Sequence, residues 1–201
     1  MKLDLYKEHA AEYKAVKKPI FVNAAPAQYL AVDGQGEPGG ECFEQCVGAL
    51  YAMAFTIKMT LKAKGQDYAV SKLEALWYPP DGGADFETAP KSEWRWKLMI
   101  RTPDFVGKQD LREAVKALQR RGKNANAGQV TLEKLHEGEC VQMLHVGPYE
   151  QLCETITAML AFAEANQRRQ HGLHHEVYLS DPRRVPPERL KTLLRQPVRK
   201  A

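Results

Sequence analysis

Several features that would assign a function directly are missing from this sequence. The cysteines form no C-x-x-C pair, and we expect Cys42 and Cys46 to be buried as small apolar groups. No apolar run approaches the ~20 residues of a membrane helix, and neither a Gly-x-Ser-x-Gly elbow nor a P-loop is present. The charged N-terminus lacks the apolar core of a signal peptide. We therefore expect a cytoplasmic protein without a membrane span.

Charge of both signs is present, but it is unevenly distributed. The net charge is +4. Residues 183–200 hold seven basic residues and one acid, which gives this tail +6 and the rest of the chain −2. The tail contains no aromatic residue, whereas nucleic-acid binding usually combines basic residues with aromatic ones. We therefore expect no nucleic-acid partner.

The sequence contains an internal repeat. Four kinds of segment occur twice in the same order: a strand with a glycine turn, a helix start, an apolar strand, and a strand with the pattern K-x-x-[IL]-R-x-P. The matching pairs are YLAVDG and VQMLHVG, FEQC and YEQLC, KLEALWYP and HHEVYLSDP, and WKLMIRTP and LKTLLRQP. The third pair aligns Glu74 with Glu176. Four pairs of similar segments in the same order indicate an internal duplication.

Each copy is predicted to fold as strand, helix, strand, strand. The leading strands are KPIFVNA and QVTLEKL, and each is expected to pair with the strand that follows it. Between the copies, residues 108–122 have apolar side chains at the spacing of an amphipathic helix, which ends at a glycine.

This pattern predicts one α+β domain over residues 1–201, with an antiparallel sheet built from two pseudo-symmetric repeats. Repeat one spans about 18–103 and repeat two about 129–198, and the copies should superpose about an approximate two-fold axis. Each repeat covers one sheet face with its helix. Where the uncovered faces meet, we expect a central ligand cleft.

Two motifs are weaker than they look. The stretch from Gly34 to Gly39 reads G-x-G-x-x-G, but Pro38 lacks an N–H and Glu37 would repel a pyrophosphate, which favours a plain turn. The histidines near Glu176 have no further well-spaced ligands around them, so no metal site is expected. No cofactor is implied.

The carboxylates are the better candidates. Strand alternation places Glu176 with Tyr178 and Glu74 with Tyr78, on the face away from the helices. A partly buried carboxylate between aromatic walls suits a flat apolar or cationic ligand and acid–base chemistry. The alternative, in which Glu176 is a strand-end acid paired with Arg183, stays open.

The remaining aromatic residues divide between core and pocket. Trp77 falls on the helix side of its strand, which favours core packing. For the face that Trp94 and Trp96 share, both locations stay open. Tyr149 heads the second helix beside a glycine-proline turn, a suitable pocket rim. The candidate ligand-binding residues are therefore Tyr78, Trp94, Trp96, Tyr149, Tyr178 and Glu74.

The stretches ECVQMLHVGPYEQ and HHEVYLSDPRRVPPERLKTLLRQPV resemble the GyrI-like small-molecule-binding family in its standalone form. In the first half, YLAVDGQGEP, KLEALWYP and WRWKLMIRTPDF are similar to the same group. The resemblance covers almost the whole chain and implies two repeats around a central ligand cleft. The expected L-W-W reads Leu76-Trp77-Tyr78 here.

The resemblance also implies a function. Family members include drug-binding domains of transcription regulators, in which a pocket glutamate meets cationic aromatic ligands, and inhibitors of DNA gyrase. Standalone members hydrolyse cyclopropane-bearing genotoxins with a glutamate that activates water, and this glutamate maps onto Glu176. The implied roles are detoxification and drug resistance.

We therefore expect a hydrolase acting on a cyclopropane carbon–carbon bond, with an aromatic, cationic or alkylating ligand. Two alternatives stay open: a non-catalytic protein that sequesters drugs, and a gyrase-inhibiting interaction protein. Strand signals begin by about Pro19, so we expect no preceding DNA-binding domain and no self-contained transcription factor. The sequence does not define an oligomeric state.

Overall fold

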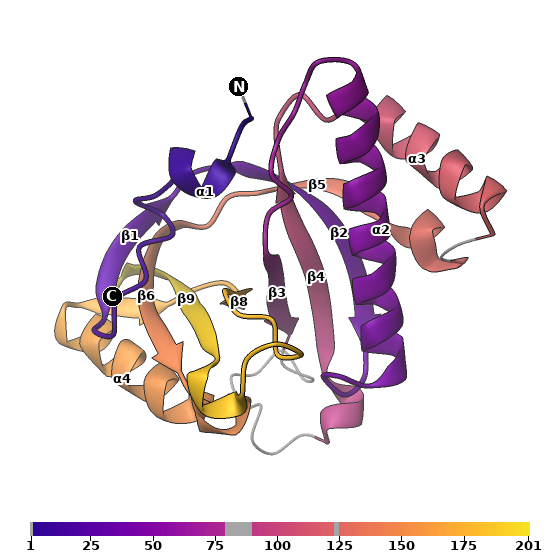
Figure 1. Cartoon of the computed structure of the whole chain (residues 1–201). Helices are drawn as coiled ribbons and strands as arrows, with labels where there is room; N and C mark the ends of the chain where they lie inside the picture. The colour runs from indigo at the N-terminus through magenta and orange to yellow at the C-terminus, as the bar shows by residue number, and fades with distance from the viewer. Residues whose placement is uncertain (1, 79–89, 123–124) are drawn as a thin grey trace. The chain divides into compact units, whose positions relative to one another are not determined.

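The structure, a computed structural model, describes residues 2–78, 90–122 and 125–201 (Figure 1). The helices are α1 (Leu5–Glu8), α2 (Glu41–Ala63), α3 (Lys108–Arg120) and α4 (Leu152–Ala165), with short 3-10 turns η1 (Lys91–Glu93), η2 (Ala125–Gln129), η3 (Tyr149–Gln151) and η4 (Pro187–Arg189). The strands are β1 (Ile20–Ala24), β2 (Ala27–Gln35), β3 (Leu73–Tyr78), β4 (Arg95–Thr102), β5 (Thr131–Leu135), β6 (Gly138–Val146), β7 (Arg168–Gln170), β8 (His174–Tyr178) and β9 (Lys191–Lys200). Antiparallel strands with helices packed on them confirm the predicted α+β class.

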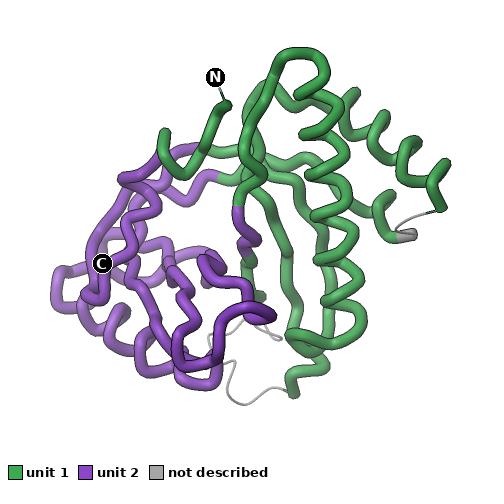
Figure 2. The backbone as a smooth tube through the Cα atoms, in the orientation of Figure 1, with its two compact units in different colours: residues 1–8, 27–71, 75–135 green, residues 9–26, 72–74, 136–201 purple. Residues whose placement is uncertain are grey.

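The chain forms two compact units whose segments interleave along the sequence (Figure 2). Unit 1 comprises residues 1–8, 27–71 and 75–135, and unit 2 comprises residues 9–26, 72–74 and 136–201. These boundaries differ from those of the predicted repeats, because the first strand of each repeat belongs to the unit that holds the rest of the other repeat.

The leading strands pair differently from the prediction. β1 pairs with β6, where Phe21 lies opposite Val141, and β5 pairs with β2, where Leu132 lies opposite Leu30. The expectation that each leading strand pairs with the next strand in the chain was therefore wrong. The physical reason lies in the connections. Only residues 25–26 separate β1 from β2, and their sequence, Ala-Pro, lacks the glycine or asparagine that a two-residue hairpin requires.

The strand register supports the internal duplication. Leu30 of β2 lies opposite Ile100 of β4, and Met143 of β6 lies opposite Leu194 of β9. These four residues correspond when the two glycine turns and the two K-x-x-[IL]-R-x-P strands are aligned. Equal register in two separate ladders is expected if both descend from one ancestral unit.

In unit 1 the strands lie in the order β3, β4, β2, β5, and α2 packs on β2 and β4 with α3 beside it (Figure 1). Phe43 of α2 stacks on Trp77, with ring centroids 6.3 Å apart, which confirms that Trp77 faces the helix. Among the described residues, α2 is the helix long and apolar enough to cross a membrane. Its buried side packs on the sheet, as a core helix of a soluble domain does.

In unit 2 the strands lie in the order β1, β6, β9, β8, and β7 pairs with the end of β9. Helix α4 covers one face, where Met159 and Ala163 pack with Val141 and Leu194 in a dry cluster. The segment before β1 crosses the other face, where the carbonyl of Lys14 accepts a hydrogen bond from Nε2 of Gln142.

The four cysteines are free thiols. Cys46 is buried as expected, and burial together with nearby Cys42 raises its pKa to about 11. Cys42 itself is exposed, so the expectation that both are buried was wrong for this residue.

Candidate functional site

Glu176 lies on the face of unit 2 that carries α4. In the β8–β9 ladder Glu176 stands opposite Leu194, and directly opposed residues of an antiparallel pair share a face. Leu194 packs against Met159 of α4, which fixes this face as the helix side. The prediction that Glu176 points away from the helices was therefore wrong, because sequence alternation separates two faces without identifying which one a helix covers.

Two tyrosines, Tyr178 and Tyr149, accompany Glu176. Tyr178 follows on the same face of β8, and its ring meets that of Tyr149 edge to face, with centroids 6.1 Å apart. The Glu176 residue is only 7% exposed. Nε2 of His174 lies 3.5 Å from Oε1 of Glu176 on the same strand face. The structure thus brings a nearly buried carboxylate, an imidazole and two phenol rings together within unit 2.

The charges around Tyr149 in this cluster are negative. Burial and then the charges of Glu176 and Asp181 together raise the pKa of Tyr149 to about 12. Asp181 stays ionised, because hydrogen bonds from the side chain and backbone of Arg183 lower its pKa to about 2. Arg183 pairs with Asp181, at 3.0 Å from Nε to Oδ1.

The pKa of Tyr149 offers a direct test of this arrangement. We expect Glu176→Gln to lower the pKa of Tyr149, because the removed charge disfavours the phenolate, while burial still holds it above the ordinary value of 10.0. Nuclear magnetic resonance of ¹³C-labelled tyrosine measures the titration. Glu150→Gln, an exposed neighbour, serves as the control. An unchanged Tyr149 pKa in Glu176→Gln would show that the two side chains are not neighbours in solution.

The turn that presents Tyr149 is held by His145, a residue that sequence reasoning missed. Nδ1 of His145 lies 2.8 Å from Oγ1 of Thr155, and Nε2 lies 3.2 Å from the carbonyl oxygen of Pro148. Because a carbonyl can only accept, Nε2 carries the proton and Nδ1 accepts from the threonine hydroxyl. Both nitrogens are thereby used to fix the start of α4. The available signal in the sequence was a histidine close before the glycine-proline turn that precedes α4.

Glu74 does not belong to this cluster. Its side chain is fully buried on the other face of unit 2, where its Oε2 lies 3.0 Å from Nε2 of His175 and its Oε1 accepts a hydrogen bond from the Tyr13 hydroxyl. Since His175 and Glu176 point to opposite faces of β8, Glu74 and Glu176 do too. The predicted equivalence of the two acids is therefore wrong, because they face opposite sides of the sheet.

Behind β8, polar side chains form a buried row across the sheet of unit 2. Gln142, Arg195 and His175 stand in register on β6, β9 and β8, and Glu74 extends the row. Glu137 joins the two cations: Oε2 lies 3.0 Å from Nη1 of Arg195, and both its oxygens lie 3.0 Å from Nδ1 of His175.

The charged forms of His175 and Glu137 are both favoured in this row. Burial alone would lower the pKa of His175, but the Glu137 and Glu74 carboxylates outweigh it and raise the value to about 9. Burial likewise opposes ionisation of Glu137, yet His175 and then Arg195 lower its pKa to about 2. His175 is therefore a cation at neutral pH.

The other candidate residues lie in unit 1. Trp96 is core: its indole covers Gly34, where an added Cβ would meet the ring at 2.0 Å. Trp94 is half-buried and meets Trp77 edge to face at 5.8 Å. Tyr78 is half-buried near Lys97, and burial raises its pKa although Lys97 acts in the opposite direction. Core packing is therefore the observed role of Trp96.

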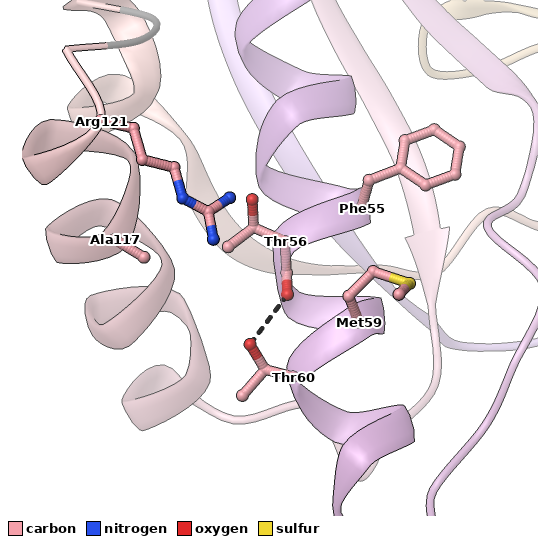
Figure 3. A pocket seen from close by; sticks show the side chains of 6 residues that line it. All are labelled: Phe55, Thr56, Met59, Thr60, Ala117 and Arg121. Atoms are coloured by element: carbon pink, nitrogen blue, oxygen red, sulfur yellow. Dashed lines mark hydrogen bonds between the residues drawn. The ribbon is translucent and has the colours of Figure 1, made fainter.

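Unit 1 also has an open groove of about 380 Å³ between α2 and α3 (Figure 3). Phe55 and Met59 are exposed along α2, and the Arg121 guanidinium extends from the end of α3. The Thr60 hydroxyl donates within α2 to the carbonyl of Thr56. None of the predicted site residues lines this groove.

Residues 17–199 match the GyrI-like small molecule binding domain. A hydrolase from Listeria innocua is 36% identical with a TM-score of 0.91, and the match covers 99% of this chain and 100% of that one. A conserved protein from the same organism is also 36% identical, with a TM-score of 0.91, and covers 98% of this chain and 100% of its own.

A more distant structure shares the fold alone. The C-terminal domain of EcmrR is 12% identical with a TM-score of 0.59, over 92% of this chain and 98% of that domain. No curated protein matches the sequence.

Proposed function

The chain belongs to the GyrI-like small molecule binding domain family, and from this premise we propose that it hydrolyses electrophilic cyclopropane-bearing aromatic compounds, with Glu176 activating the water. The observation that carries the proposal is the nearly buried Glu176 carboxylate beside Tyr149 and Tyr178. The hydrolase from Listeria innocua supports the reaction class. The cyclopropane substrate comes from the resemblance of the His175–Glu176 stretch to standalone family members.

The aromatic rings supply the binding. Tyr149 is the more exposed of the pair, and its edge-to-face contact with Tyr178 leaves ring surface on which a flat ligand can stack. The negative charge of Glu176 and Asp181 favours ligands that are cationic or electron-poor. Stacking holds the strained ring against the carboxylate, which lowers the entropic cost of orienting it.

The proposed step is an addition of water. The water oxygen forms a bond to one ring carbon while the strained carbon–carbon bond breaks, and that electron pair moves to the electron-withdrawing group attached to the other carbon. Glu176 accepts the proton that the water releases and returns it to the newly formed anion. A carboxylate within hydrogen-bond reach of the water suffices for this general-base role.

Turnover tests the proposal against simple sequestration. Purified protein is incubated with a neutral arene that carries an activated cyclopropane, and ring-opened product is quantified by mass spectrometry. We expect product to exceed one equivalent of protein many times over. A plateau at or below one equivalent would mean that the protein binds such molecules without hydrolysing them.

A further inference from the structure

The buried row behind β8 is not used by the proposed chemistry, yet its central residue is the chain neighbour of Glu176. The His175 ring is fully buried between Glu137 and Glu74. Backbone carbonyls from the N-terminal segment complete the row. The carbonyl of Glu12 accepts from Nη2 of Arg195 at 2.7 Å, and that of Lys14 accepts from Nε2 of Gln142 at 3.1 Å.

Stability alone does not explain such a row. Two carboxylates and two cations lose their hydration here, and apolar residues of similar volume often stabilise a core equally well. What the row provides is position. His175 is held at Nδ1 by Glu137 and approached at Nε2 by Glu74, so the ring has little freedom to rotate. A fixed ring fixes the Cα of His175 and therefore the backbone on either side of it.

Strand β8 depends on this anchor. Four of its five residues, His175 to Tyr178, pair with β9, and a loop that contains Gly172 precedes the strand. Neighbouring side chains of a strand point to opposite faces. A rotation of β8 about its axis that displaces His175 therefore turns Glu176 by a similar angle on the other face. The front cluster is sensitive to such a turn, because general-base geometry tolerates errors of only about 0.5 Å.

We propose that His175 is the positioning residue of the Glu176 site: its charged ring, held from behind by Glu74 and Glu137, locks β8 so that Glu176 and Tyr178 are presented correctly. The site then works only while His175 is protonated. This inference rests on the proposed function for its catalytic readout, but the lock itself also affects ligand binding.

The groups that face His175 determine its proton affinity. Glu137 reaches it from the turn before β6, Glu74 from β3 and Arg195 from β9, while the Tyr13 hydroxyl bonds to Glu74 from the N-terminal segment. The Cys140 thiol nearby is neutral, because burial and then the charge of Glu137 raise its pKa to about 12. Loss of the His175 proton would leave Glu74 buried opposite a neutral ring, which weakens the lock at alkaline pH.

The test compares the titration of His175 with the pH dependence of the site. Imidazole ¹H–¹³C spectra, assigned with His175→Gln, give the pKa of His175, and turnover of the neutral cyclopropane substrate is measured over the same range. In the wild-type protein we expect turnover to fall as His175 deprotonates. Glu74→Gln removes one carboxylate, so both transitions should move together to lower pH by about one unit or more.

Two variants control the experiment. Glu74→Asp keeps the charge and should restore both transitions toward the wild-type pH. Glu139→Gln neutralises a more exposed acid that pairs with Arg168, and it should move neither transition. Tyr149 does not produce the same transition, since its pKa is about 12.

A binding measurement distinguishes failure of the positioning role from failure of the proposed hydrolysis. If no substrate is turned over, the dissociation constant of the neutral fluorophore N-phenyl-1-naphthylamine replaces turnover, and the same joint shift is expected. If Glu74→Gln lowers the pKa of His175 but leaves the pH midpoint of turnover or binding unchanged, the positioning role is wrong. A His175 ring that is neutral at pH 7 would overturn it as well.

Discussion

Replacing Glu176 with glutamine should lower kcat by roughly 10²–10⁴-fold on a neutral substrate, the usual range for loss of a general base. The amide keeps the shape of the side chain in its nearly buried position. It cannot accept a proton from water at neutral pH, so the chemical step loses its base. Because a neutral ligand gains little from the carboxylate charge, its dissociation constant should change far less than kcat.

Steady-state kinetics together with direct binding measure this separation. Glu150→Gln is the matched control, since it removes an exposed carboxylate next to Tyr149 without touching the cluster, and it should retain wild-type kcat. Full turnover in Glu176→Gln on the neutral substrate would falsify the base assignment and leave Glu176 as a ligand contact.

Replacing Glu137 with glutamine should lower the free energy of unfolding by about 3–5 kcal/mol, the usual cost of removing one partner from a buried ion pair. In the native protein this carboxylate lies between Arg195 and His175, each with a nitrogen 3.0 Å away. Without its charge, the two cations face each other across adjacent strands. Neither reaches water to recover its hydration.

Urea denaturation followed by circular dichroism measures the loss. Glu139→Gln is the control, because its ion pair with Arg168 is more exposed and solvent screens it, so unfolding should be nearly unaffected. If both variants unfold alike, the buried row does not contribute as described.

The pKa shifts also set the pH range of this stabilisation. The pKa of Glu137 is lowered from 4.5 to about 2 on folding, so its contribution is present above 4.5 and is lost as pH falls toward 2. The pKa of His175 is raised from 6.5 to about 9, so its contribution is complete below 6.5 and is lost as pH rises through 9. The stabilisation from this row is therefore greatest between about pH 4.5 and 6.5.

Local patterns predicted the features that depend on one strand or one helix. The alternation of apolar residues placed Trp77 against the helix, and its stacking on Phe43 confirms this. The same alternation placed Glu176 with Tyr178, and a helix start beside a glycine-proline turn placed Tyr149 near them. Such features follow from backbone periodicity, which the sequence carries directly.

Features that depend on which strands meet were not predictable in this way. The pairing of β1 with β6 depends on chain segments far apart in the sequence, and the assumption that neighbours in the chain pair failed here. Aligning Glu74 with Glu176 placed both acids on one face, but Glu74 meets His175 on the opposite face. A shift by one residue exchanges the two faces of a strand, so Glu74 was assigned to the wrong side.

The buried row was missed, although a signal for it was present. Arg195 stands inside the apolar stretch LLRQPV, and an arginine in a strand with apolar neighbours requires a buried counter-charge. Glu137 supplies that charge from a turn 58 positions away. Its sequence context, His-Glu-Gly between two strands, does not distinguish it from an ordinary solvated turn.

Because β1 pairs with β6 and β5 pairs with β2, neither unit can complete its sheet early in protein synthesis. When β1 leaves the ribosome its edge is unpaired, and its partner β6 begins only at Gly138. Unit 1 likewise waits for β5, which comes from the second half of the gene. A nascent chain or a proteolytic fragment that holds only one half therefore lacks a strand and exposes an edge prone to aggregation.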